Sequence, residues 1–400
     1  MLQNAVLVIN CGSSSLKFSL INLQTNELLF SGIAERLLSS EAFIKINLNG
    51  NKQQNDLPAP FDHQTALSCL VAFMLKHKFE QQLFAVGHRV VHGGEHYSEP
   101  TLITAQVKNT ISDLAQLAPL HNPVNLIGIN AAEVAFAHLP QVAVFDTAFH
   151  QTMPQKAFIT GLPYKFYKEH GIRNYGFHGT SHYYVSNQAA ALLNKPITEC
   201  SFISAHLGNG CSVTAIENGK SVDTSMGLTP LSGVVMGTRC GDIDPGIILH
   251  LMEQLNYSVA DVSKILNKES GLLGISQMSN DCRTLEQAII DDNDLTANLA
   301  IDIFCYRIAK SIASFVASLS HLDGVIFTGG IGENSDLVRS RIARSLHLLN
   351  IELDADKNLS TRFGKSGVIS TQLSANCLVI PTNEEQVIAE QTYQLIKAEK

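Results

Sequence analysis

The sequence predicts an α/β protein of two similar domains, each with a mixed β-sheet, and a cleft between the domains. Three observations lead to this fold class. The chain has 400 residues, more than one hydrophobic core usually contains. Apolar runs of strand length alternate with helical stretches along the sequence. A pattern of strand, glycine turn, strand, turn and strand occurs twice, near residues 6–34 and 201–224.

The first domain is predicted over residues 1–150 and begins with a three-stranded meander. Its third strand follows a turn at Gln24-Thr25-Asn26. The expected strands of this domain are Val6–Ile9, Phe18–Leu23, Glu27–Ala34, Phe84–Val91 and Val142–Phe145, and a helix is expected around Gln64–Lys78. We place the domain boundary near Thr147–Pro154.

The second domain is predicted over residues 151–384 and repeats this order. A glycine turn at 208–210 and an Asn-Gly pair at 218–219, typical of a type I′ hairpin, separate its first strands. The expected strands are Ser201–His206, Cys211–Glu217, Lys220–Thr224, Asp323–Phe327 and Cys377–Ile380, and a helix is expected over Leu299–Leu319. A last helix, Glu384–Ala398, is expected to join the first domain through residues 385–400.

Composition excludes several classes of protein. The formal net charge of −8 argues against broad binding to nucleic acid or to an anionic membrane. The eight cysteines form no C-x-x-C pair, and the N-terminal apolar run lacks a cationic flank and breaks at Asn10. The most apolar late segment, residues 308–327, carries Lys310, His321 and Asp323, so no membrane span is expected. We therefore expect a cytoplasmic protein with reduced thiols.

The first hairpin has the composition of a phosphate cradle. Gly12 and three serines lie between two apolar strands, and Lys17 follows. Small residues let backbone N–H groups approach an anion, and hydroxyl and ammonium groups add donors. The segment is not a P-loop, since G-x-x-x-x-G-K-[ST] is absent and a strand follows. An ordinary β-hairpin is the alternative.

Three polar residues follow predicted strands or lie among small residues. Arg89 ends a strand beside two glycines, where its planar fork can bind a carboxylate or phosphate; the alternative is a surface ion pair. Asp146 ends a buried strand, a usual place for catalytic carboxylates, or else caps a turn. His178 can donate to a phosphoryl oxygen or serve the structure. A zinc pair with His182 is disfavoured because no further ligand has the required spacing.

Two glycine loops and an acidic segment complete the candidates. Arg239 lies among glycines and can neutralise a phosphoryl group in transfer, or pair with Asp242 or Asp244. The stretch FTGGIGEN suggests a nucleotide loop ahead of a helix that starts after Asn334 or Ser335. In PTNEE, Glu384 can bind Mg²⁺, or the segment can simply cap the final helix.

Taken together, the segments resemble the acetokinase family, within the superfamily of acetate and sugar kinases, heat-shock chaperones and actin. The motifs that carry the resemblance, in chain order, are HRVVHGG, FDTAFH, YGFHGTSH, HLGNG, GTRCGDIDP, FTGGIGEN and PTNEE. The resemblance covers nearly the whole chain. It implies two actin-like (ribonuclease H-like) domains, a homodimer formed through the C-terminal domain, and reversible phosphorylation of acetate by MgATP to acetyl phosphate and ADP, with Mn²⁺ able to replace Mg²⁺.

The resemblance also implies residue roles. Asn10 and Glu384 resemble the metal site, Lys17 a phosphate contact, Arg89 the acetate-carboxylate binder, Val91, Leu120 and Pro230 the walls of a methyl pocket, Asp146 the catalytic acid, and His178 and Arg239 the transition-state stabilisers. The residues that resemble ATP-binding loops are His206, Leu207, Gly208, Asn209, Gly210, Asp281, Cys282, Arg283, Gly329, Gly330, Ile331, Gly332 and Glu333. Cys11 and Cys282 depart from the usual family residues, a small residue and an aromatic one respectively, and Cys282 can alter purine packing.

Two other functions are compatible with most of these motifs. A propionate or butyrate kinase of the same family would differ in the methyl pocket. An actin-like or chaperone-like nucleotide switch would share the hairpins and the glycine loop but would not need a carboxylate-binding arginine. Because a carboxylate acceptor is already ionised at neutral pH, it needs no general base. We therefore expect Asp146 to position Arg89, a metal-bound water or the acceptor rather than to take a proton.

Overall fold

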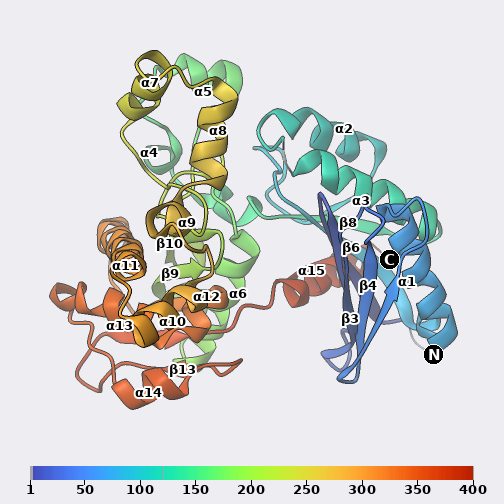
Figure 1. Ribbon diagram of the computed structural model, residues 1–400. Coiled ribbons are helices and arrows are strands. Elements are labelled where there is room, and N and C mark those ends of the chain that lie inside the picture. Colours follow the sequence, from blue (N-terminus) through green and yellow to red (C-terminus); the bar gives the residue numbers. More distant parts are fainter. Residues whose placement is uncertain (1–2, 120, 400) are drawn as a thin grey trace. The chain divides into compact units, whose positions relative to one another are not determined.

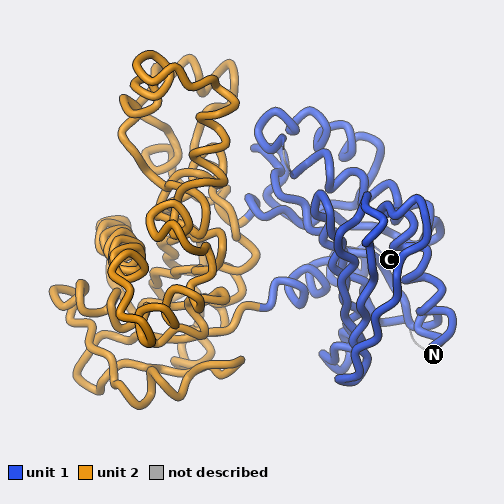
Figure 2. Tube along the Cα trace, viewed as in Figure 1, with its two compact units in different colours: residues 1–148, 383–400 blue, residues 149–382 orange. Residues whose placement is uncertain are grey.

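The computed structural model describes residues 3–119 and 121–399. The chain forms two compact units, with residues 1–148 and 383–400 in unit 1 and residues 149–382 in unit 2 (Figure 2). Each unit is built around one mixed β-sheet, and the elements are labelled in Figure 1. Within the described residues, no helix combines the length and apolar character needed to span a membrane.

Unit 1 contains an eight-stranded sheet in the order β5-β4-β3-β2-β1-β6-β8-β7. The strands are β1 (Ala5–Gly12), β2 (Ser15–Asn22), β3 (Glu27–Glu35), β4 (Phe43–Leu48), β5 (Asn51–Asp56), β6 (Leu83–Val90), β7 (Thr101–Leu102) and β8 (Gln141–Phe145). Strands β1 to β5 form an antiparallel meander, whereas β1, β6 and β8 run parallel. The helices of unit 1 are α1 (His63–His77), α2 (Ala105–Asp113), α3 (Asn122–Ala135) and α15 (Glu384–Ala398).

The two faces of this sheet are covered by different helices because side chains alternate along each strand. Leu7 and Ile9 pack into the cluster that includes Leu67 of α1 and Ala132 of α3. Val6, Val8 and their counterparts on β6 and β8 pack instead against Ile388 and Ala389 of α15. The last helix is therefore part of unit 1, although 234 residues of unit 2 precede it in the chain.

Unit 2 contains a six-stranded sheet in the order β11-β10-β9-β12-β14-β13. Its strands are β9 (Ser201–Leu207), β10 (Cys211–Glu217), β11 (Lys220–Thr224), β12 (Gly324–Thr328), β13 (Gly367–Val368) and β14 (Asn376–Val379). The helices are α4 (Gln155–Phe158), α5 (Lys165–His170), α6 (Gly179–Leu192), α7 (Pro245–Glu253), α8 (Val259–Lys268), α9 (Gly271–Ser276), α10 (Cys282–Asp292), α11 (Leu295–Phe315), α12 (Gly329–Asn334), α13 (Asp336–Arg344) and α14 (Ala355–Ser360).

The two sheets share a topology, as the repeated pattern predicts. In each, three successive antiparallel strands are followed by two parallel strands and an antiparallel edge strand, and in unit 1 two further strands extend the meander. The predicted strands, the hairpin turns and helices α1, α11 and α15 are confirmed within a few residues. At the Asn-Gly turn, Asn218 and Gly219 both have the positive φ angles of a type I′ hairpin, 52° and 76°.

Two parts of the secondary structure differ from expectation. The sequence analysis missed β4 and β5, which extend the meander with a ribbon whose outer strand, β5, consists entirely of exposed polar residues. The glycine stretch after β12 is helix α12 rather than a loop, whereas the helix expected after Asn334 or Ser335 is confirmed as α13, which begins at Asp336. Strand β4 does alternate, with Ile44 and Ile46 buried, but the all-polar β5 and the glycines inside α12 both oppose the usual sequence preferences.

Candidate functional site

In unit 1, the polar candidates lie at one end of one sheet face. Val6 and Val8, Ala85, and Val142 and Val144 face α15. By the two-residue alternation of strands, Asn10, Arg89 and Asp146 continue this face where β1, β6 and β8 end. Lys17, on β2, is the cross-strand neighbour of Asn10 on β1. Glu384 begins α15, and its carboxyl group interacts electrostatically with Arg89, Asp146 and Lys17.

Arg89 and Asp146 form a bidentate ion pair. Arg89 Nε lies 3.0 Å from Asp146 Oδ1, and Arg89 Nη2 lies 2.5 Å from Oδ2. Asp146 is 1% exposed and the arginine side chain 23% exposed. Burial alone would lower the pKa of Arg89, but the charges of Asp146 and Glu384 outweigh it and hold the pKa above its ordinary value. The pair therefore presents a permanent cation in a fixed orientation.

Glu384 is the candidate metal ligand of unit 1. Its Oε1 atom is buried and has no hydrogen-bond partner among the described residues. Burial, and after it the charge of Asp146, raises the pKa of Glu384 to about 7, although Arg89 opposes the shift. An unpartnered buried carboxylate oxygen is costly unless a cation or proton satisfies it. The donor set of Glu384 with Asn10 therefore fits a hard cation such as Mg²⁺, which often uses few protein ligands.

The PTNEE segment also caps the final helix, which was the alternative interpretation. Asn383 caps α15, because its Oδ1 accepts the Gln386 N–H at 3.1 Å. The cap and the neighbouring carboxyl group of Glu384 are separate side chains, so the start of α15 can be capped by Asn383 and also present a carboxylate oxygen.

In unit 2, His178 and His206 are held by serine hydroxyls. His178 occupies the position before α6 with a left-handed φ of 56°, and its ring stacks on that of His206 with centroids 4.3 Å apart. Ser212 Oγ lies 2.9 Å from His178 Nδ1 and 2.7 Å from His182 Nε2. Ser181 Oγ lies 2.8 Å from His206 Nδ1. Burial lowers the pKa of His182 well below its ordinary value, so this ring is neutral at pH 7.

Arg239 lies near His178, and no carboxylate among the described residues forms an ion pair with it. A Cβ atom on Gly210 would lie 3.4 Å from both Arg239 Nη1 and His178 Nε2, so both side chains border this glycine. The guanidinium donates to the Pro230 carbonyl at 2.9 Å, and burial lowers its pKa below the ordinary value. The expected alternative pairing is wrong: Asp242 accepts from the Gly233 N–H, and Asp244 caps α7. A partly buried cation that has no acidic partner among the described residues is suited to binding an anion.

A cavity of about 500 Å³ in unit 2 brings together parts of all three predicted nucleotide loops. Its lining residues are Gly208, Asn209, Asn280, Asp281, Cys282, Arg283, Glu286, Gly330, Ile331, Asn334, Ser335, Arg362 and Phe363. Gly329, behind the cavity, has a φ of 75°, and a Cβ there would lie 2.7 Å from the Leu207 carbonyl oxygen. Only glycine fits at this position, which explains why the strand is followed by this residue type.

Some predicted residues have other contacts. Glu333 Oε1 accepts the N–H groups of Gly329 and Thr382, both at 3.0 Å, so its carboxylate ties the start of α12 to the segment after β14. Val91 lies in unit 1 and Pro230 in unit 2, and Leu120 lies outside the described residues. The methyl pocket and the individual ligand contacts stay predictions.

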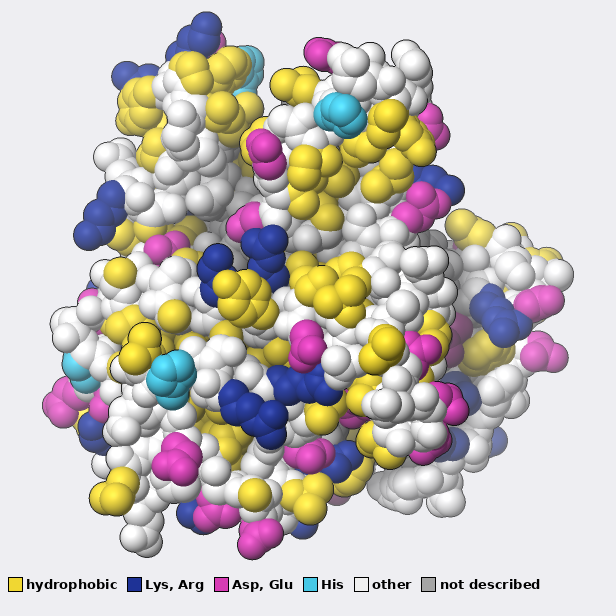
Figure 3. Space-filling view, turned by 60° about the vertical axis from the view of Figure 1, so that its left-hand side comes forward, with side chains coloured by type: hydrophobic (Ala, Val, Ile, Leu, Met, Phe, Trp, Pro, Cys, Tyr) yellow, Lys and Arg dark blue, Asp and Glu magenta, His cyan; other side chains and the backbone are white. Residues whose placement is uncertain are grey.

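The sequence analysis missed six residues that line the cavity. They are Asn280, Glu286, Asn334, Ser335, Arg362 and Phe363. Asn280, Asn334 and Ser335 are adjacent to predicted loops, and that adjacency was the available signal. Nothing local marks Glu286 on α10 or the segment after α14. On the face in Figure 3, Lys and Arg side chains gather locally although the net charge is −8.

Comparison with known proteins shows matches over nearly the whole chain. The family model of the acetokinase family matches residues 5–390. An acetate kinase of Shewanella sp. (strain W3-18-1) is 54% identical over 401 residues, covering 100% of both chains. A propionate kinase structure from Francisella tularensis has 44% identity and a TM-score of 0.93, covering 98% of this chain and 99% of the other.

A crystal structure of Porphyromonas gingivalis acetate kinase has 40% identity and a TM-score of 0.93, covering 98% of this chain and 100% of the other. Together with the two mixed sheets, these structures confirm the predicted fold class. The likeness extends over both units rather than one of them. The chain therefore belongs to the acetokinase family.

Proposed function

We propose that this protein is an acetate kinase that transfers the terminal phosphoryl group of ATP to acetate, reversibly and by direct in-line displacement, forming acetyl phosphate and ADP. The observation that carries the proposal is Arg89, a permanent cation held by a buried carboxylate with part of its fork still exposed. A guanidinium in this state suits a small carboxylate. The full-length similarity to an acetate kinase supports the same activity.

The acceptor side of the reaction needs little proton chemistry. Acetate is ionised at neutral pH and attacks as a carboxylate, so Asp146 has no proton to remove. Asp146 already accepts from Arg89 through both carboxylate oxygens. Its proposed role is to orient Arg89, which in turn holds the acetate oxygen on the line of attack.

The donor side uses unit 2. The cavity bordered by Gly208 and Gly330 takes the nucleotide. His178 and Arg239, which border Gly210, donate to the transferred phosphoryl group, whose charge is spread over its outer oxygens. In unit 1, Asn10 and Glu384 are the residues that would hold the metal, and Lys17 is the proposed phosphate contact. Mg²⁺, or Mn²⁺ in its place, supplies neutralisation of phosphate charge when bound.

A propionate kinase is the second candidate, favoured by the 44% identical propionate kinase structure. One methylene in an apolar pocket is worth about 1–3 kcal/mol, so discrimination between acetate and propionate is a matter of degree. Butyrate extends the same series. A nucleotide switch of the actin or chaperone type binds no small carboxylate and would not need the Arg89–Asp146 pair.

The test is acyl phosphate formation trapped with hydroxylamine, using purified protein, MgATP and acetate, propionate or butyrate. An acetate kinase gives the highest kcat/KM with acetate, a lower value with propionate and little with butyrate. A preference for propionate reassigns the substrate but keeps the chemistry. ATP binding without acyl phosphate from any acid contradicts the kinase proposal.

The proposed kinase is a cytoplasmic homodimer. Exposed apolar side chains on and beside α7 and α8 support a contact surface in unit 2; they are Ile247, Leu249, Leu255, Tyr257 and Val259. Light scattering with size-exclusion chromatography tests the assembly. A mass near twice 43.5 kDa supports the dimer, and a mass near 43.5 kDa contradicts it.

A further inference from the structure

Phe363 is an unusual residue at the edge of the cavity in unit 2. The residue is 79% exposed, and its φ of 55° lies in the left-handed region. An exposed aromatic side chain and a left-handed backbone at a residue with a large Cβ substituent both cost free energy. Such a combination persists only where surrounding contacts hold it, and Phe363 lines the 500 Å³ cavity.

The backbone of Phe363 is hydrogen-bonded to α12, which lines the cavity. The Phe363 N–H donates to Asn334 Oδ1 at 2.9 Å, and Asn334 Nδ2 donates to the Gly330 carbonyl at 3.0 Å. Asn334 thus links the aromatic residue to α12 through one amide group. The preceding Arg362 donates to Asp336 Oδ1 at 2.8 Å, and its guanidinium lies 4.9 Å from the centre of the Phe363 ring.

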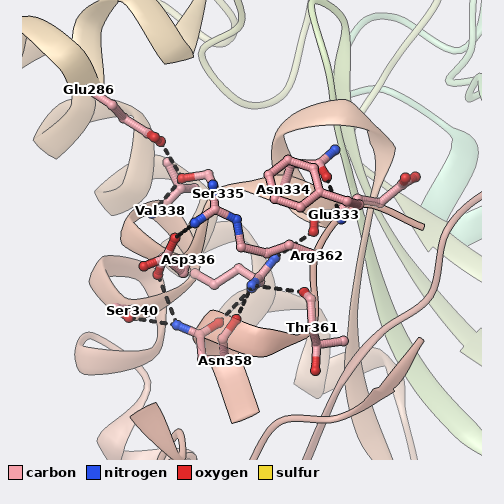
Figure 4. Close-up of polar contacts among 12 residues, drawn as sticks. Glu286, Glu333, Asn334, Ser335, Asp336, Val338, Ser340, Asn358, Thr361 and Arg362 are labelled. Atoms are coloured by element: carbon pink, nitrogen blue, oxygen red, sulfur yellow. Dashed lines mark hydrogen bonds and ion pairs between the residues drawn. The ribbon is translucent and has the colours of Figure 1, made fainter. Parts of the chain in front are cut away.

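A buried arginine, Arg339, is hydrogen-bonded to the segment that precedes Phe363. Arg339 has no exposed surface, and burial lowers its pKa to about 10. It donates to the carbonyls of Gly332 and Glu333 at the end of α12, both at 2.9 Å. It also donates to both oxygens of Asn358 and to the Thr361 carbonyl, two residues before Phe363 (Figure 4). Arg339 therefore joins α12 and the segment before Phe363 in one hydrogen-bonded network.

The direction of a nucleotide in this cavity follows from its two ends. Gly208 and Asn209 line one end, and Gly210, next in the chain, borders His178 and Arg239. Arg283 and Arg362 also line the cavity, but they are paired with Asp281 and Asp336, whereas Arg239 has no carboxylate partner among the described residues, so phosphates point to the Gly208 end. The base then lies toward Glu286, Ser335 and Phe363. Cys282 offers little surface for stacking, since it is buried and its thiol contacts Glu286 Oε1.

We propose that Phe363 is the stacking surface for the nucleotide base, held in a strained conformation by Asn334 and Arg339 for that purpose. The inference rests on the proposed nucleotide-binding role of the cavity and names the group that contacts the base. Stacking on an aromatic ring tolerates different bases because every base has a π-face. Phe363 therefore strengthens the binding of purine nucleotides generally rather than selecting one of them.

The test compares Phe363→Ala with Phe363→Trp and with Leu373→Ala, a matched control that removes a 91% exposed side chain of the same unit outside the cavity lining. We expect Phe363→Ala to raise the KM for ATP and the Kd for ADP about tenfold, with kcat and the KM for acetate within twofold of wild type. Phe363→Trp and Leu373→Ala are expected to stay within threefold of wild type in both nucleotide constants.

Inorganic tripolyphosphate separates stacking from a loss of local structure. It carries the phosphates without a base, so its inhibition constant against ATP should be the same in wild type and Phe363→Ala. An unchanged Kd for ADP in Phe363→Ala overturns the inference, as does an equal weakening of tripolyphosphate and ADP. A wild-type protein that binds no nucleotide instead overturns the proposed function.

Discussion

Asp146 holds the guanidinium of Arg89 from the Nε side. Nε lies 3.0 Å and 3.1 Å from the two carboxylate oxygens, and Nη2 lies 2.5 Å from Oδ2. The buried carboxylate leaves Nη1 as the nitrogen not engaged by Asp146. One residue thus fixes the direction in which another can bind a small anion. The predictions for unit 1 depend on this relationship.

Replacing Arg89 should separate acetate binding from nucleotide binding. We expect Arg89→Ala to raise the KM for acetate roughly 10- to 100-fold, because a charge-assisted hydrogen-bonded contact is worth about 1.5–3 kcal/mol. The KM for ATP should change less than threefold. Arg89→Lys keeps the charge but loses the planar fork, so it should recover only part of the affinity. Steady-state kinetics with both substrates test this, and equal losses for the two substrates would contradict the role.

Replacing Asp146 distinguishes positioning from proton transfer. Asp146→Asn keeps an oxygen near Arg89 but removes the charge that holds it. If Asp146 orients Arg89, the KM for acetate should rise at least tenfold and Tm should fall, because a buried cation loses its partner. The pH profile of kcat should keep its shape near neutrality. A collapse of kcat with an unchanged KM for acetate would favour a general base instead.

Glu384 should control the metal requirement. Glu384→Gln is nearly isosteric and removes the ionisable oxygen whose partner is missing among the described residues. We expect the Mg²⁺ concentration for half-maximal activity to rise at least tenfold, while Tm without metal stays equal or increases because no charge is buried. Glu385→Gln, the next residue along α15, is the control and should leave the Mg²⁺ dependence unchanged. The same Mg²⁺ curve for both variants and wild type would rule out the assignment.

Arg239 should act on the rate rather than on nucleotide affinity. Removing a cation that stabilises a transferred phosphoryl group costs on the order of 10³–10⁵ in rate. We expect Arg239→Ala to lower kcat by at least 10³ while the Kd for ADP, measured by calorimetry, stays within threefold. Arg36→Ala, which removes an exposed arginine paired with Glu41 in unit 1, should have normal kinetics. Turnover near the wild-type rate in Arg239→Ala would remove the residue from the mechanism.

The buried histidines predict a loss of stability in acid. Burial lowers the pKa of His88 and of His150 to about 4, below the ordinary value of 6.5. Between these pH values the unfolded chain binds protons that the folded chain does not, so the free energy of unfolding falls as pH drops from about 6.5 to about 4. Tm should therefore decrease between pH 7.5 and pH 5. The decrease should be smaller in His150→Gln, and an identical slope would contradict the assignment.

Much of the fold could be predicted because its signals are local. Strand β1 is an apolar run that ends in a glycine and serine turn, and β10 and β11 are joined by an Asn-Gly pair with the expected positive φ angles. The ends of two apolar runs also placed Arg89 and Asp146 at strand ends. The helix α12 could not be predicted in this way, since its glycines disfavour a helix. Its packing against β9 and the hydrogen bonds from Arg339 stabilise it there.

The sequence by itself determined most of the longer strands except β4 and β5, the hairpin turns, the polar residues at strand ends and the family to which the motifs belong. Tertiary structure alone decided which partner each polar residue has: Ser212 between His178 and His182, Asp146 rather than solvent beside Arg89, and Arg339 beneath Thr361. The physical reason is the sequence range over which each kind of interaction acts. Turn chemistry and side-chain alternation act over a few residues, whereas these contacts join segments 22 to 57 residues apart and form only when the sheets and helices pack.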